Sequence, residues 1–422
     1  MTEQSPAKVT ARDLLRNRDF RLLWLGQSIS NFGDSMTNLA LLLLVNHLTG
    51  STAALATMAI VLALPTLTFG LLAGVYVDRW DRKRVMIISD LIRGILVLGF
   101  MLVDAPEKVW LLYVIGFVQA SIGTFFNPAR SALIPNLVAR EGLLAANSLT
   151  QMTQIIFGLL GTAAAGAVIG LLDMYWPVFV IDALTFFAAL TLVSFIHYKS
   201  QIAPKQGAVS PKAIASELVG GLRITFGNRI LAGTILAAAV TMLGLGAVNV
   251  LLVPLIVNDL QIPETWFAGV EFAQTSAMIL SGALVAILAA KFKPTQILTV
   301  SFIGVGLVIG LMSGVSAAWH LILILFAAGW FITPLQASAQ TIAQTAVPDE
   351  VRGRTGAANN AFITTANLIS MAAAGLLADA IGVRTVFIVS GVVVASAGLI
   401  AALMFRGVEM PQPKAVTQSA EV

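Results

Sequence analysis

The sequence predicts an all-α integral membrane protein built from twelve transmembrane helices in two six-helix bundles. Of its 422 residues, 58% are hydrophobic and 11% are charged, whereas a soluble domain has about 25% charged residues. The mean hydropathy is +0.89, and apolar segments long enough to cross a bilayer recur along the chain. Lysine and arginine gather between alternate segments, which is typical of a multi-pass topology.

Twelve apolar segments account for most of the chain. We expect helices at residues 20–47, 51–77, 84–103, 108–134, 143–171, 176–197, 224–257, 264–290, 295–314, 319–345, 356–380 and 384–405. The first of them is too long, and too closely followed by the second, to be a cleaved signal peptide.

Two terminal segments flank these helices. Residues 1–19 are expected to form a cytoplasmic amphipathic segment, in which Thr10 can cap a short helix and Leu14 and Leu15 can enter the membrane interface. Residues 406–422 are expected to be a disordered cytoplasmic tail. Both segments are too short for an appended soluble domain, so a sensor is not expected.

The positions of lysine and arginine orient the helices. All but three of the 25 lie in the N-terminal segment, in the tail or near the loops that follow even-numbered helices; the exceptions are Arg93, Lys108 and Arg384. Cytoplasmic loops attract positive charge, so both termini are expected on the cytoplasmic side of a cell inner membrane. An error of one helix in the count would destroy this asymmetry.

A polar linker at residues 198–223 divides the chain into two halves, 20–197 and 224–405, that look like repeats. Phe-Asn-Pro at Pro128 and Ile-Thr-Pro at Pro334 are separated by about half the chain, and each opens a similar stretch. Parallel six-helix repeats imply a pseudo-two-fold axis along the membrane normal, with a substrate site between the halves near the midplane.

The first helix carries a polar stripe within an apolar segment. Gln27, Asn31, Asp34 and Asn38 are spaced by four, three and four residues, so they share one helix face. A charged carboxylate at the bilayer centre costs about 2.5–3.5 kcal/mol on insertion scales. This face is therefore expected to meet a water-filled or protein-lined cavity.

Polar residues with helical spacing also occur in helices 5, 8, 10 and 11. The candidates for the cavity are Asn147, Gln151, Gln154, Glu271, Gln274, Gln336, Gln340, Asn360 and Asn367. Helices 9 and 12 have no such residues in their interiors, and helices 3 and 6 carry Asp90, Arg93 and Asp182, which we place toward their ends. Every third helix is therefore expected to face lipid while the others surround the cavity.

Asp34 and Glu271 are the acidic residues expected to lie deepest. A carboxylate kept from water in an apolar cavity can exchange protons near neutral pH, so both are candidates for proton coupling or substrate binding. The structural alternative is a polar residue hydrogen-bonded to neighbouring amides.

The other charged residues in the helices have structural interpretations. Asp90 and Arg93 are three residues apart and are expected to form an ion pair. Asp173, Asp182 and Asp379 are expected near the outer boundary, either solvated or paired with helix ends.

The loop between helices 2 and 3 reads Gly74-Val-Tyr-Val-Asp78-Arg79-Trp-Asp81-Arg82-Lys83-Arg84. Together with the two six-helix repeats, it resembles the G-x-L-x-D-R-x-G-R-(R/K) motif of the major facilitator superfamily. The resemblance implies the major facilitator fold and a monomer. It also implies a conformational latch between the halves, in which Asp78 pairs with a cytoplasmic arginine, for which we take Arg130. The latch candidates are Gly74, Asp78, Arg79, Arg82, Arg84, Asp90, Arg93 and Arg130; a plain basic anchor is the alternative.

Shorter stretches are similar to one branch of that superfamily, which holds macrolide-efflux and enterobactin-export proteins. They are Phe32-Gly33-Asp34-Ser35, Leu48-Thr49-Gly50-Ser51, Asp90-Leu-Ile-Arg93, and Phe126-Asn127-Pro128 through Asn147. The resemblance implies an efflux protein.

The sequence as a whole predicts an alternating-access exporter of amphipathic, cationic or neutral organic compounds, driven by proton antiport. The candidate apolar walls are Phe32, Met36, Phe125, Phe272, Met278 and Trp330. No G-x-x-x-x-G-K-(S/T) loop occurs, so we expect an ion gradient as the energy source and no cofactor. Siderophore or metabolite export, and translocation of lysophospholipids or other lipids, remain open on the same scaffold.

An enzyme is not expected. The chain has no cysteine and three histidines, His47, His197 and His320, all near helix ends. No nucleophile or metal set for an intramembrane hydrolase is therefore predicted, and no nucleic-acid partner is expected.

Overall fold

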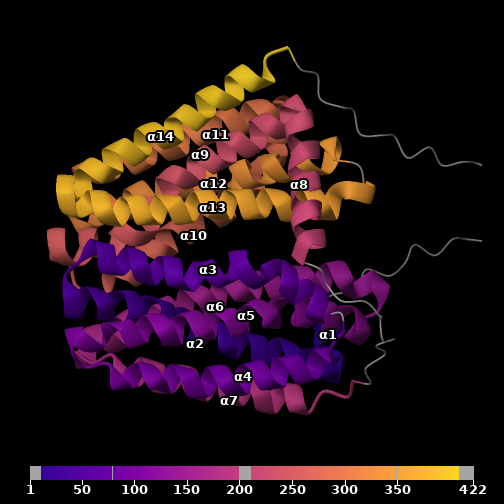
Figure 1. Ribbon diagram of the computed structural model, residues 1–422, viewed down its shortest axis with the longest axis vertical. Coiled ribbons are helices and arrows are strands. Elements are labelled where there is room, and N and C mark those ends of the chain that lie inside the picture. The colour runs from indigo at the N-terminus through magenta and orange to yellow at the C-terminus, as the bar shows by residue number, and fades with distance from the viewer. Residues whose placement is uncertain (1–10, 78, 199–210, 348, 408–422) are drawn as a thin grey trace, which may run out of the picture.

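The computed structural model describes residues 11–77, 79–198, 211–347 and 349–407. Over these residues the elements are helices, arranged as two bundles that lie side by side with their helices roughly parallel (Figure 1). The all-α fold with two six-helix bundles is confirmed. The predictions for residues 1–10, among them the Thr10 cap, and for the tail beyond residue 407 lie outside the described residues.

Each bundle contains six long helices. The N-terminal bundle comprises α2 (Arg18–Thr49), α3 (Thr52–Val77), α4 (Arg82–Leu98), α5 (Val109–Leu137), α6 (Leu143–Leu172) and α7 (Trp176–Ser194). The C-terminal bundle comprises α9 (Arg229–Val253), α10 (Trp266–Lys291), α11 (Pro294–Leu311), α12 (Ala318–Ala346), α13 (Asp349–Ile381) and α14 (Val383–Phe405). Shorter elements are α1 (Ala11–Arg16), α8 (Pro211–Gly227), η1 (Gly99–Leu102), η2 (Pro106–Lys108), η3 (Arg140–Gly142), the π-helix η4 (Pro254–Asp259) and η5 (Met312–Gly314).

Local capping explains where several of these helices begin. The Asn17 side chain accepts hydrogen bonds from the backbone N–H groups of Asp19 and Phe20 and so starts α2. Asn228 caps α9 in the same way, which separates α9 from α8, a helix that crosses the end of the bundles (Figure 1). The helix predicted at 224–257 therefore begins five residues later in the structure, at Arg229. The helix α8 occupies much of the predicted linker.

Eleven helices among the described residues are long and apolar enough to cross a membrane. The twelfth is α2, whose 32 residues span about 48 Å at 1.5 Å per residue. Its polar stripe lowers its mean hydropathy, but it packs inside the bundle against α6 and α7. Twelve crossing helices are consistent with this arrangement.

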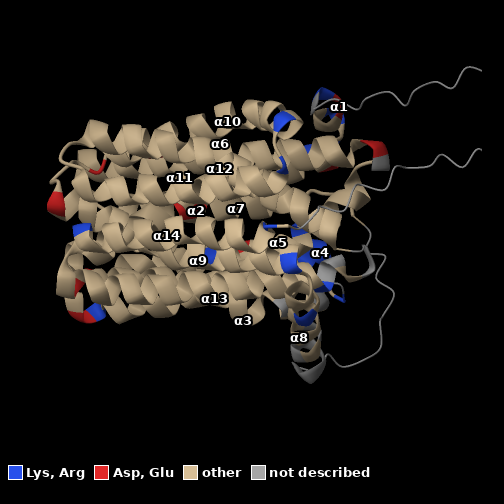
Figure 2. Ribbon diagram, turned by 90° about the horizontal axis from the view of Figure 1, so that it is seen from above, with Lys and Arg blue, Asp and Glu red and all other residues tan. Residues whose placement is uncertain are grey.

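Both termini leave the molecule at the same end, which we call the terminal end (Figure 1). Most of the lysine and arginine residues lie at or near this end, and few lie at the opposite end (Figure 2). The helix boundaries and the charge asymmetry therefore agree with each other, as expected for a multi-pass membrane protein.

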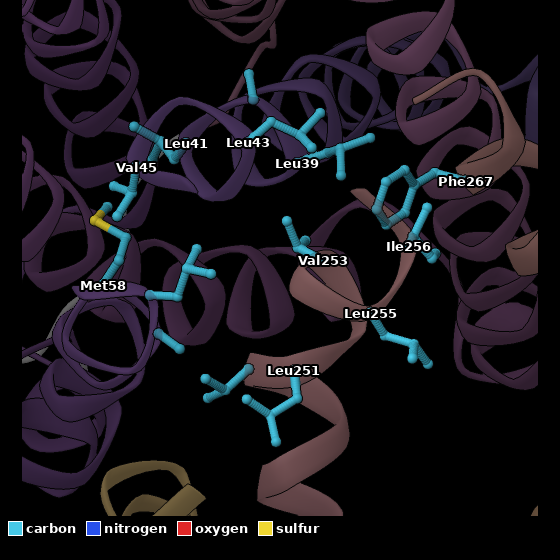
Figure 3. Packing of buried hydrophobic residues seen from close by; sticks show 14 of the residues in the cluster. Leu39, Leu41, Leu43, Val45, Met58, Leu251, Val253, Leu255, Ile256 and Phe267 are labelled. Carbon is cyan, nitrogen blue, oxygen red and sulfur yellow. The ribbon is translucent and has the colours of Figure 1, made fainter. Parts of the chain in front are cut away.

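The two bundles share a hydrophobic core. Its residues come from helices throughout both bundles, and Figure 3 shows the part where α2, α3, α9, η4 and α10 meet. Leu41 and Leu43 on α2 and Leu251 on α9 are almost completely buried within it. Direct contacts between the bundles are made mainly by α3 with α13 and by α6 with α10.

The helices at every third position carry many exposed apolar side chains, as a lipid-facing surface would. Examples are Ile88 and Ile95 on α4 and Val392 and Leu403 on α14. The outer helices pack in pairs, α4 with α7 and α11 with α14. Leu14 differs from its expectation, because it is buried in a core cluster with Phe20 and Leu133 and does not face the interface.

Candidate functional site

A polar cavity of about 340 Å³ lies within the N-terminal bundle, between α2, α3, α4 and α5. The whole predicted stripe of α2 lines it: Gln27, Asn31, Asp34 and Asn38. The arrangement follows from the helical spacing of these residues, because one face of α2 turns inward. Polar side chains that the sequence reasoning did not select also line it, namely Ser30, Ser35, Thr37, Thr66, Gln119, Thr124 and Asn127.

Asp34 and Arg93 form a salt bridge at this cavity, in which the Arg93 Nη2 donates to the Asp34 Oδ1. The side chains are 27% exposed for Asp34 and 11% for Arg93. Arg93 also lies over the Phe186 ring, with 4.4 Å between the guanidinium carbon and the ring centroid. Arg93 also lies beside Gly123 on α5, where a Cβ would be in ordinary contact with the guanidinium carbon at 3.8 Å. Arg93 is thus enclosed by three neighbouring helices.

The expected Asp90–Arg93 ion pair is wrong for this structure. Arg93 reaches across to Asp34 on α2, while both carboxylate oxygens of Asp90 are buried and have no hydrogen-bond partner among the described residues. Spacing of three residues on one helix permits the pair, but the Arg93 side chain instead reaches the acceptor that Asp34 offers on α2.

The expectation for Asp182 is also wrong. Asp182 is fully buried inside α7 and accepts hydrogen bonds from the Thr37 hydroxyl at 2.6 Å and the Thr185 hydroxyl at 3.1 Å. Nor does Asp90 lie toward a helix end, since it occupies the middle of α4. The sequence contained a clue to both positions, because a carboxylate in an otherwise apolar transmembrane helix usually faces the interior of the bundle.

The expectation for Asp379 fits better. It lies near the end of α13, and its Oδ1 accepts from the hydroxyl of Thr52, the first residue of α3, at 2.6 Å. Asp173 is an exposed residue that ends α6 in a left-handed conformation with φ 51°. Asp379 is thus paired with a helix end, and Asp173 is located at one.

A second cavity, of about 600 Å³, lies between α6 of one bundle and α10 and α12 of the other. Predicted residues in its lining are Gln151, Gln154, Glu271 and Gln336, joined by Met278 from the predicted apolar walls. Glu271 accepts a hydrogen bond from Thr162 on α6. Gln154 lines both this cavity and the polar one, so the two adjoin.

A third cavity, of about 380 Å³, lies between α3, α5, α8 and α13 and includes the predicted residue Asn360. Thr66, Thr124 and Asn127 line it and also the polar cavity. The polar cavity therefore adjoins both of the other cavities, which lie at the boundary between the bundles.

Some predicted residues lie elsewhere. Asn147, Gln274, Gln340 and Asn367 are absent from the linings of these three cavities. Among the predicted apolar walls, Met36 is 1% exposed and belongs to the core. Phe125 stacks against Trp80 beside a separate groove on α4 and α5.

The described latch candidates other than Asp90 and Arg93 lie toward the terminal end of the N-terminal bundle, and these two lie deeper, along α4. Arg82 donates to the Ala132 carbonyl at 2.9 Å, and Arg130 donates to the Gln27 Oε1 at 3.4 Å. Arg84 is exposed, and its backbone N–H is capped by Asp81. Gly74 lies within α3 and Arg79 follows that helix. Asp78 lies outside the described residues, so its pairing with Arg130 stays a prediction.

Direct hydrogen bonds between the bundles occur at the end opposite the termini. Asn46 on α2 and Asn258 on η4 exchange two of them, at 2.9 and 3.0 Å. Thr52 donates to the Gly375 carbonyl at 2.8 Å in addition to its bond with Asp379. The structure is thus closed between the bundles at this end.

Comparison with protein families adds the family relationship. Residues 10–421 match a family described as transmembrane secretion effectors. Macrolide efflux protein A of Streptococcus pyogenes is 26% identical over 391 residues, which cover 89% of this chain and 93% of that protein. The multidrug efflux pump Tap of Mycobacterium bovis is 25% identical over 386 residues, covering 87% of this chain and 89% of that protein.

Solved structures share the fold at low sequence identity. A bacterial homologue of the iron transporter ferroportin, in an inward-facing state, superimposes with a TM-score of 0.73 at 15% identity, covering 93% of this chain and 99% of that one. A bacterial homologue of the human lysosomal transporter Spinster, inward-facing and unoccupied, gives 0.70 at 13% identity, covering 96% and 98%.

Proposed function

The chain belongs to the transmembrane secretion effector family of the major facilitator superfamily, and we propose that it is a proton-coupled exporter of amphipathic organic compounds. The observation that supports this most directly is the Asp34–Arg93 pair beside a polar cavity of about 340 Å³ inside an otherwise apolar bundle. A charged pair is expensive to keep in a membrane domain, so in such a place it marks a substrate or ion pathway.

The chemistry of the adjoining cavities favours amphipathic compounds. The cavity between the bundles combines Glu271 and the amides of Gln151 and Gln154 with apolar side chains such as Ile155 and Met278. The carboxylates of Asp34 and Glu271, one in each of two cavities, favour cationic or neutral substrates. Large apolar surfaces favour bulky organic substrates. The efflux proteins among the relatives are consistent with export.

The mechanism that we propose is alternating access, in which the two bundles rock about the cavities. The structure would then represent the state that is open toward the terminal end, since the direct hydrogen bonds between bundles lie at the opposite end. With the terminal end in the cytoplasm of an inner membrane, this state accepts substrate from inside. A proton that enters down the membrane potential gains about 2.3 kcal/mol per 100 mV. This gain helps to drive the export of a neutral compound, whereas the exit of a monovalent cation cancels it and leaves the pH gradient as the driving force.

Lipid translocation is the second candidate, and one observation favours it. Ile155 on α6 and Ile279 on α10 line the cavity between the bundles, and they are 41% and 64% exposed. An apolar edge at this boundary is what a lipid chain would need to enter sideways.

Reconstituted vesicles test both candidates. The full chain is placed in vesicles with an imposed pH gradient, and movement of ethidium, erythromycin and a fluorescent lysophospholipid is followed together with internal pH. We expect Asp34→Asn to abolish movement driven by the gradient, whereas Asp104→Asn, at an exposed loop carboxylate, should move substrate as the unaltered chain does. Full transport by Asp34→Asn would remove Asp34 from the mechanism. Movement of the lysophospholipid alone would favour translocation.

A further inference from the structure

Asp90 has an unusual environment for a carboxylate. It lies in the middle of α4, it is 0% exposed, and neither oxygen has a hydrogen-bond partner in the part of the chain that the structure describes. An ionised carboxylate in such a place would have neither water nor a donor to stabilise its charge. This environment favours the neutral, protonated form of Asp90.

Arg93 has spare hydrogen-bonding capacity close by. It lies three residues further along α4, on the same helix face as Asp90. One of its terminal nitrogens, Nη2, donates to Asp34, whereas its Nε is buried and has no hydrogen-bond partner among the residues described. An unpaired donor and an unpaired acid thus lie within one turn of the same helix.

The charged groups around Asp90 come from every helix packed near it. Arg93 on α4 and Asp34 on α2 both interact with it electrostatically. The neighbouring helix α7 carries Asp182, which accepts from two threonine hydroxyls. The other neighbour, α5, carries Arg130, which is engaged with Gln27. Arg93 thus interacts with three carboxylates, the partly exposed Asp34 and the buried Asp90 and Asp182, and can pair closely with one of them at a time.

We propose that Arg93 alternates between Asp34 and Asp90, and that Asp90 is the residue that carries the counter-transported proton. The proposal rests on the proton-coupled export proposed above and assigns its proton site. When the cationic group of a substrate binds Asp34, Arg93 is displaced and turns to Asp90. The O–H bond of Asp90 then breaks, its electron pair stays on the carboxylate that now pairs with Arg93, and the proton passes to water in the cavity.

The charges in this exchange balance. Before substrate binding, Asp34 and Arg93 neutralise each other and Asp90 is neutral. Afterwards the substrate cation neutralises Asp34, and Arg93 neutralises Asp90. One positive charge enters and one proton leaves, so the exchange of a monovalent cation is electroneutral and follows the pH gradient without depending on the membrane potential.

Asp182 provides a matched control for Asp90. Both are aspartates, fully buried, on adjacent helices of one bundle. Asp182 differs because Thr37 and Thr185 hold its oxygens, so its role is to join α7 to α2. An Asp→Asn change keeps the size of the side chain at either position, and it removes the negative charge and the ability to exchange a proton. At Asp182 the amide also keeps one oxygen as an acceptor for a threonine hydroxyl.

The test measures proton release as ethidium binds to the purified full chain in weakly buffered detergent solution. We expect about one proton per ethidium bound for the unaltered chain and for Asp182→Asn. Asp90→Asn should bind ethidium and release none. Proton release by Asp90→Asn at the level of the unaltered chain would overturn the proposal. Absence of ethidium binding to every form would count against the proposed function for cations and would leave the next measurement to decide on Asp90.

Infrared spectroscopy reads the proton on Asp90 without any substrate. The protonated carboxyl band at neutral pH should lose intensity in Asp90→Asn. Arg93→Gln, in which the switch is missing, should retain this band and yet release no proton with ethidium. If the band is the same in Asp90→Asn as in the unaltered chain, then Asp90 is ionised and the proposal is wrong, whatever the protein transports.

Discussion

Asn46 and Asn258 exchange a pair of amide hydrogen bonds across the two bundles. Asn46 is 6% exposed and lies in the last turn of α2. Asn258 lies on η4, the π-helix that begins at Pro254. Because each amide supplies a donor and an acceptor, the pair satisfies itself only when the bundles are together at this end. It is therefore a contact of one conformational state.

Asn258→Ala should shift the protein toward states that are open at the end opposite the termini. The change leaves the Asn46 amide without its partner, which costs about 1–3 kcal/mol and corresponds to a shift of about 5- to 150-fold between the two states. The chain has no cysteine, so spin labels at Glu107→Cys and Ser316→Cys, both exposed at that end in different bundles, can report the distance.

A control for this measurement is Thr57→Val. The Thr57 hydroxyl donates to the Ala53 carbonyl of its own helix, so its loss should leave the label distances unchanged. Equal distance distributions in Asn258→Ala and the unaltered chain would show that the amide pair does not hold the state.

Two glycines one turn apart on α6 should respond differently to alanine. A Cβ at Gly161 would collide with the Phe32 carbonyl oxygen and crowd the Ser35 Cβ at 3.0 Å, whereas a Cβ at Gly158 would meet only the Ser35 Oγ at 3.5 Å. We expect Gly161→Ala to destabilise the fold by about 1–3 kcal/mol through overpacking. Gly158→Ala should be neutral or stabilising by up to about 1 kcal/mol, because alanine favours the helix.

Thermal unfolding of the two purified variants in the same detergent checks this difference. Similar unfolding temperatures for both would mean that α2 can move away from α6 at no cost, which would also weaken the case for close helix packing at this position.

The polar stripe of α2 was predictable from sequence, whereas the partners of Arg93 were not. Four polar residues at spacings of three and four define a direction on a helix, so the sequence could place Asp34 on a cavity. Asp90 and Asp182 are nearly alone in apolar helices, and single residues define no direction. The prediction that every third helix faces lipid then placed both helices at the lipid surface, although α4 and α7 each turn one side toward the interior of the bundle.

Pairing between helices was the second limit. Spacing along α4 favoured Asp90 as the partner of Arg93, because local geometry is all that a single sequence provides. The choice of Asp34 depends on how the helices around Arg93 pack, and close contacts with α7 at Gly33 on α2 and Gly94 on α4 position both helices. The Asn46–Asn258 pair likewise depends on the π-helix η4, which cannot be predicted from the helical spacing of residues.

Tyr175 should titrate well above ordinary tyrosines. It lies between α6 and α7, outside the crossing helices, and burial raises its pKa to about 12, with Glu264 and Asp173 acting in the same direction. Because the pKa is higher in the folded state, its contribution to stability is fully present below about pH 10 and is lost as the pH rises toward 12. The chain has four tyrosines, so the difference between absorbance titrations of the unaltered chain and Tyr175→Phe can isolate the ionisation of Tyr175. A step that is missing from the high-pH range would contradict the burial of this ring.

Glu271→Gln should weaken the handling of cations more than that of neutral compounds. Glu271 lines the cavity between the bundles and is hydrogen-bonded to Thr162 across them. The amide keeps the shape and the contact with Thr162 but removes the negative charge. A hydrogen bond or ion pair to a charged group contributes about 1.5–3 kcal/mol, so the KM for ethidium should rise by about tenfold or more, since 1.4 kcal/mol is a factor of ten.

Erythromycin is a less suitable probe of charge because it carries an amine, so the neutral arm of this comparison uses an uncharged dye of similar size. Its KM should change by less than about threefold in Glu271→Gln. Thr162→Val serves as the second control, since it removes the hydrogen bond and keeps the carboxylate, and it should leave the preference for cations in place. If Glu271→Gln alters the two substrates equally, Glu271 joins the bundles and does not recognise charge, and the selectivity for cations then depends on Asp34 alone.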